Sequence, residues 1–174
     1  MRFAALDTRF LLALAGGQFD AEATIDYLQR NSFCPIVTES VIEQLGELQR
    51  DSGNPAHDAA VIASKNFVTW GIYDPSNPNV DNGTSCVHAE KIMEQGLIPD
   101  AMTIEAEMLV EASCHNCELF ITFSQPLLNA PSSQLNLALI ESGLVTVTIA
   151  IASPEMISER LQLLDEEVLM ENKL

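Results

Sequence analysis

Short apolar segments alternate along the chain with segments whose apolar residues recur at helical spacing. The predicted strands are residues 2–6, 35–38, 66–73, 118–122 and 144–150. The predicted helices span about 10–15, 20–30, 38–48, 55–64, 85–95, 103–113, 135–142 and 154–170. Strands that are apolar throughout and separated by helices are typical of a parallel sheet covered on both faces. We therefore predict an α/β fold, a three-layer αβα arrangement around a mainly parallel five-stranded sheet with the first strand at its centre.

The length of the chain fits one domain. Its 174 residues are enough for a single core, so we expect one domain over 1–174. An apolar fraction of 47% with 19% charged residues is typical of a globular protein. No apolar run reaches the ~18 residues that span a bilayer, and charged residues interrupt the first apolar stretch. We expect a soluble, cytoplasmic protein without a membrane partner.

The charge is strongly acidic. Twenty-five acidic residues against eight basic ones give a net charge of −17, and the basic residues form no cluster. Affinity for nucleic acid depends largely on basic side chains that neutralise phosphates. The composition therefore provides no electrostatic surface for RNA or DNA, and it disfavours anionic membranes.

Polar residues at the carboxyl ends of the predicted strands are the first candidates for a site, because ligands of parallel sheets bind there. Asp7 follows the first strand and directly precedes a helix. Thr122 and Ser124 lie at the end of the strand 118–122.

Glu105 is a further candidate, in the first turn of the helix 103–113. At 100° per residue it falls between Met108 and Ala112 on the apolar face, where an unpaired carboxylate is costly. Either it complements the helix dipole or it belongs to a site. By the same calculation, Glu107 and Glu111 lie off that face and are expected to be solvated.

The helix after Thr38 offers an amide rather than an acid. Its buried stripe is formed by Val41, Leu45 and Leu48, and Gln44 flanks that stripe. Glu43 is expected to point roughly the opposite way, into solvent.

Two cysteines, Cys114 and Cys117, have the spacing of a metal-ligand half or of a redox pair. The sequence has no second CxxC pair, and Cys86 and His88 are too far away in sequence to be taken as the other half of a metal site. We expect a packed helix-to-strand junction, with structural zinc and redox chemistry as alternatives.

Four motifs together resemble the PIN-like domain family, the α/β fold of many metal-dependent ribonucleases and of the toxin half of many toxin–antitoxin pairs. The motifs occur in the family's order, within residues 3 to about 150. They are Leu6–Leu12, Val37–Leu45, Gly96–Pro99 leading into Glu105–Ala112, and Leu119–Ser124.

The resemblance implies a ring of acids that holds Mg²⁺ or Mn²⁺ for phosphodiester attack. At the four matching positions this chain has Asp7, Gln44, Glu105 and Ser124, so only Asp7 and Glu105 are carboxylates and would be the metal ligands. Thr8 and Thr122 would orient these ligands, and Gln44 and Ser124 would act through them.

Two functions follow from this site. The first is a Mg²⁺- or Mn²⁺-dependent ribonuclease with Asp7 and Glu105 as its catalytic residues. The second is a PIN-like domain whose chemistry has lapsed and which binds or scaffolds other molecules. RNA, an antitoxin-like or other protein, and a second copy of the chain are the partners to consider. Four apolar residues of the last predicted helix would serve a dimer or pack on the sheet: Leu161, Leu164, Val168 and Leu169.

Overall fold

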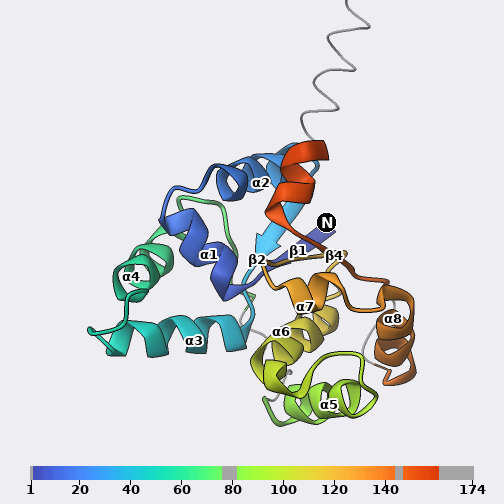
Figure 1. The fold of residues 1–174 in the computed structure, drawn as a ribbon. Helices are drawn as coiled ribbons and strands as arrows, with labels where there is room; N and C mark the ends of the chain where they lie inside the picture. The colour runs from blue at the N-terminus through green and yellow to red at the C-terminus, as the bar shows by residue number, and fades with distance from the viewer. Residues whose placement is uncertain (1, 76–81, 144–146, 161–174) are drawn as a thin grey trace, which may run out of the picture.

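A parallel sheet forms the centre of the computed structural model, which describes residues 2–75, 82–143 and 147–160 (Figure 1). Its strands are β1 (Arg2–Leu6), β2 (Phe33–Ile36), β3 (Leu119–Ile121) and β4 (Ala150–Ala152). Their order is β2-β1-β3-β4, and each neighbouring pair is parallel. The α/β class, the parallel sheet and the interior position of the first strand are confirmed.

Helices connect the strands. They are α1 (Thr8–Ala15), α2 (Phe19–Arg30), α3 (Glu39–Arg50), α4 (His57–Asn66), α5 (Asn82–Glu94), α6 (Thr103–Cys114), α7 (Gln125–Leu128) and α8 (Ser132–Glu141). A 3₁₀ turn, η1 (Asp100–Met102), precedes α6, and residues 154–160 are helical. The rest of the predicted last helix, with its four apolar residues, lies outside the described residues. Helices α1, α3 and α4 contact one another, and α5 packs along α6 (Figure 1).

The sheet has four strands in the described part of the chain rather than the predicted five. Helix α4 runs to Asn66, and the N–H of Trp70 donates to the Asn66 carbonyl at 2.9 Å, which continues the helical turns. Gly71 then adopts a left-handed conformation (φ +67°), and Val68 is 92% exposed. The alternating apolar residues of 66–73 therefore form turns, and Tyr73 alone pairs with the sheet, through one parallel bridge to β2.

The last predicted strand is displaced along the chain. Strand β4 begins at Ala150, where the predicted strand 144–150 ends. Residues 144–146 lie outside the described residues.

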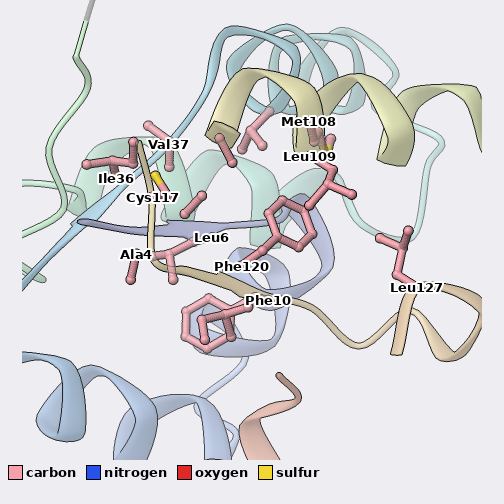
Figure 2. Close-up of a cluster of buried hydrophobic side chains, with 14 of the residues drawn as sticks. Ala4, Leu6, Phe10, Ile36, Val37, Met108, Leu109, Cys117, Phe120 and Leu127 are labelled. Carbon is pink, nitrogen blue, oxygen red and sulfur yellow. The ribbon is translucent and has the colours of Figure 1, made fainter. Parts of the chain in front are cut away.

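The core occupies both faces of β1. Ala4 and Leu6 point to one side of the strand, where Phe10 of α1 lies, as Figure 2 shows. On the other side, Phe120 of β3 meets Leu109 of α6 (Figure 2). Burial on both faces explains why β1 has no alternation of apolar and polar residues.

An amide side chain fixes the chain just before β4. The N–H of Ile149 donates to Asn136 Oδ1 at 2.8 Å, and Asn136 Nδ2 donates to the Ile149 carbonyl at 3.0 Å. Asn136 thus connects α8 to this segment by pairing both backbone groups of a buried residue.

Asn136→Ala is expected to lower the free energy of unfolding by about 1–3 kcal/mol, because it leaves these buried backbone groups unpaired. Urea unfolding measures the loss. Gln134→Ala, at an exposed position of the same helix, is the control and should change stability little. Equal losses in the two variants would contradict this role of Asn136.

Candidate functional site

Asp7 lies where sequence analysis placed it, between β1 and α1. Its side chain is buried, with 2% of the residue exposed. Oδ1 accepts a hydrogen bond from the Phe10 N–H at 2.7 Å, which caps α1. Oδ2 accepts one from the Thr122 hydroxyl at 2.5 Å, which joins the residue to the end of β3. Both carboxylate oxygens are therefore already engaged within the fold.

The surroundings of Asp7 raise its pKa from 3.8 to about 6. Burial is the largest cause, because it disfavours the charged form. The hydrogen bonds from Thr122 and Phe10 lower the pKa, as does the positive charge of Arg9. The negative charge of Glu105 raises it, so the two carboxylates predicted to form the site interact electrostatically.

Glu105 is paired with a cation of the chain itself. Its Oε1 lies 3.6 Å from Arg9 Nη2, and its side chain is 20% exposed against 61% for Arg9. Arg9 thus acts on both carboxylates: it forms an ion pair with one and lowers the pKa of the other.

Thr122 and Ser124 extend the network at the end of β3. The Thr122 oxygen accepts a hydrogen bond from the Ser124 N–H at 2.9 Å, while its own hydrogen goes to Asp7. The buried Ser124 hydroxyl contacts the sulfur of Met102 at 3.9 Å, a weak acceptor. Thr122 therefore orients Asp7 directly, and Ser124 acts on it through Thr122.

Thr8 and Gln44, the other two predicted site residues, take no part in the hydrogen bonds around Asp7 in the described part of the chain. Thr8 is buried beside Asp7, and its hydroxyl has no hydrogen-bond partner in the described part of the chain. Gln44 is half-buried on α3, and no hydrogen bond among the described residues joins it to Asp7 or Glu105.

Glu111 is a buried carboxylate that was wrongly expected to be solvated. Its Oε1 accepts a hydrogen bond from the Ser40 hydroxyl at 2.7 Å, and its Oε2 accepts one from the Ser40 N–H at 3.1 Å. Burial raises the pKa of Glu111, and the two hydrogen bonds from Ser40 lower it. The nearby Thr38 hydroxyl also lowers this pKa, although its geometry is not that of a hydrogen bond. Residues 108–113 are all buried, so α6 has no solvated face at Glu111. The apolar residues on both sides of Glu111 in the sequence, Met108–Val110 and Ala112, are the feature that could have predicted its burial.

Cys114 and Cys117 lie at a packed helix-to-strand junction, as expected. Cys114 ends α6, and Cys117 is fully buried just before β3. Burial raises the pKa of the Cys117 thiol to about 12 and also raises that of Cys114. Neither environment favours the thiolate that metal binding and redox exchange require.

A shallow hollow of about 480 Å³ adjoins the site. Arg9 and Phe123, which line it, are close in sequence to Asp7 and Thr122. Its other lining residues come from α1, from the turn before α2, and from the start of α4 and the loop before it. The hollow is thus lined by residues close in sequence to both Asp7 and its hydrogen-bond partner Thr122.

The site supplies only part of what a tightly held metal ion needs. Mg²⁺ takes six oxygen ligands, and protein sites usually provide them through carboxylates, water and substrate phosphates. Here Asp7 is buried and Glu105 is paired with Arg9, whose charge opposes a cation. Across the described ranges, no group of three or more His, Cys, Asp or Glu residues is placed to hold a metal ion.

Comparison with known proteins adds no assignment: no family model matches the chain, and no curated protein matches it significantly in sequence. Within the described residues, no helix is long and apolar enough to cross a membrane.

We expect a pH dependence of stability that originates at Asp7. Because its pKa is higher in the folded than in the unfolded state, folding binds protons between pH 4 and 6. The free energy of unfolding should therefore fall as pH rises through this window, by up to about 3 kcal/mol from this residue. Asp7→Asn should remove this fall, and urea unfolding at several pH values measures it.

The fold is expected to survive in Asp7→Asn, because the Thr122 hydroxyl can rotate to accept from the new amide. Glu111→Gln is the matched control: the raised pKa of Glu111 acts in the same direction, so this variant should keep the contribution of Asp7. Parallel stability curves for wild type and Asp7→Asn would contradict the assignment.

Proposed function

We propose that the chain is a PIN-like domain, a three-layer αβα fold, which binds other molecules and whose catalytic site has lapsed. The order of the four motifs and the parallel sheet with β1 inside it support the fold. The position of Asp7 at the carboxyl end of β1 supports the location of the site.

The state of the Asp7 carboxylate carries the functional part of this proposal. A catalytic carboxylate must reach a substrate, a metal ion or a water molecule. Asp7 is 2% exposed, and both of its oxygens accept hydrogen bonds that hold α1 and β3 together. This geometry favours a structural role for the residue that the resemblance makes the main metal ligand.

The neighbouring residues support the same interpretation. Gln44 and Ser124 are neutral at two of the family's four acidic positions. Glu105, the remaining acid, has Arg9 as its counter-ion. The net charge of −17 also repels a polyanionic substrate such as RNA.

A Mg²⁺- or Mn²⁺-dependent ribonuclease is the second candidate. The observation that favours it is the electrostatic interaction between Asp7 and Glu105, since a divalent cation held by these two carboxylates would relieve their repulsion. In such an enzyme the cation would polarise the scissile phosphate of RNA.

Mn²⁺ distinguishes the two candidates. For a lapsed site, millimolar Mn²⁺ should leave the melting temperature of the wild-type protein unchanged, and the protein should not cleave RNA. For a ribonuclease, Mn²⁺ should raise the melting temperature according to RT ln(1 + [L]/Kd). Stabilisation and RNA cleavage that are both lost in Asp7→Asn would contradict our proposal and support the enzyme.

Restoring the family's acids tests the placement of the site. We expect the triple variant Arg9→Gln, Gln44→Glu, Ser124→Asp to gain stabilisation by Mn²⁺, because it adds two carboxylates and removes the competing cation. Ser124 is fully buried, so an Asp there is costly without a counter-ion, which should enlarge the effect of Mn²⁺. Arg9→Gln alone is the control. A triple variant that folds and shows no response to Mn²⁺ would mean that the site is misplaced.

A further inference from the structure

The hollow beside the Asp7 site combines a mainly apolar lining with one cation. Leu12 of α1, Ala59 of α4 and Phe123 after β3 form part of its wall, and Arg9 and Gln18 supply its polar side chains. Its volume of about 480 Å³ is within the range of pockets that hold small molecules.

Arg9 has unused hydrogen-bonding capacity in this hollow. A guanidinium group carries five N–H donors in a planar fork that matches a carboxylate. Among the described residues the Arg9 guanidinium donates no hydrogen bond, and its ion pair with Glu105 has an N–O separation of 3.6 Å. By contrast, Arg2 approaches its partner Glu118 to 2.8 Å. Arg9 can therefore accept an anionic group from outside.

The lining indicates what kind of anion fits. A polyanion would meet a single cation in the hollow and the repulsion of a chain with net charge −17. A ligand with one negative charge and an apolar body would pair with Arg9 and bury its body against Leu12, Ala59 and Phe123. A nucleic acid strand is therefore disfavoured relative to an apolar monocarboxylate.

Gln18 favours a peptide over other monocarboxylates. It is exposed at the position before α2, and its side chain makes no capping hydrogen bond there. A glutamine amide offers both a donor and an acceptor, which is what a peptide group of an extended chain requires. A hydrocarbon chain would leave this amide unused.

We propose that the hollow binds the C-terminal end of a polypeptide, with its terminal carboxylate on Arg9 and its last apolar side chains against the wall. This inference rests on the proposed function, because it names the partner class of the binding module.

Two peptides that differ only at the terminus test the inference. Acetyl-Ala-Val-Leu-Leu with a free carboxylate and the same peptide with a C-terminal amide are titrated into ¹⁵N-labelled protein and followed by NMR. We expect the acid to shift the backbone signals of Leu12, Ala13 and Ala59. The amide should bind about tenfold more weakly, as expected for the loss of a charge-assisted hydrogen bond.

Variants separate the charge from the apolar wall. Arg9→Gln should abolish the difference between acid and amide, whereas Arg30→Gln, an equal change of charge at an exposed position at the end of α2, should retain it. Ala59→Leu, which fills part of the hollow with a residue that suits a helix, should weaken both peptides.

Equal binding of acid and amide, or binding of neither, would overturn the inference. A single-stranded RNA pentanucleotide that shifts the same signals when the peptides do not would also overturn it. None of these outcomes by itself refutes the lapsed site, whose failure is read from Mn²⁺ stabilisation and RNA cleavage. The two proposals can therefore fail separately.

Discussion

The two hydrogen bonds of the buried Asp7 carboxylate determine how the centre of this fold is joined. One fixes the first turn of α1 through Phe10, and the other fixes the end of β3 through Thr122. Strand β1 pairs with β2 on one side and with β3 on the other. Asp7 therefore stands where the chain's connections diverge, which in open parallel sheets is the usual place for a ligand. In this chain the position is filled by the protein's own hydrogen bonds.

The exposed charged group nearest in sequence to Asp7 is Arg9, two residues further along the chain. Because Asp7 caps α1, Arg9 lies on the exposed side of the first helical turn, where it meets Glu105 and the hollow. The Asp7 carboxylate is buried, whereas the Arg9 guanidinium is 61% exposed. The charged group that this end of β1 presents at the surface beside the hollow is therefore a cation.

Glu111, like Asp7, is a buried carboxylate that accepts a hydrogen bond from the first turn of a helix. Helices α1 and α3 both begin at the carboxyl ends of neighbouring strands, and in each a buried carboxylate accepts a hydrogen bond from one N–H of the first turn. Asp7 is local to its helix, whereas Glu111 reaches Ser40 from α6, 71 residues away. The hydrogen bonds from these N–H groups lower the pKa of each carboxyl, but burial raises it by more, so both acids serve as acceptors for the helix start at a net cost to their charged forms.

The sequence by itself determined the alternation of strands and helices, the parallel class and the position of Asp7 at the end of β1, because these depend on local periodicity and on a helix cap. Tertiary structure decided the rest. It converted the apolar alternation of 66–73 into turns around Gly71, whose left-handed backbone breaks a strand. It also buried Glu111. Because α6 is enclosed on several sides, the position of a residue around this helix does not tell whether its side chain is exposed or buried. It also brought Arg9 to Glu105, a contact between residues far apart in sequence, which only the packing of α6 beside the sheet can create.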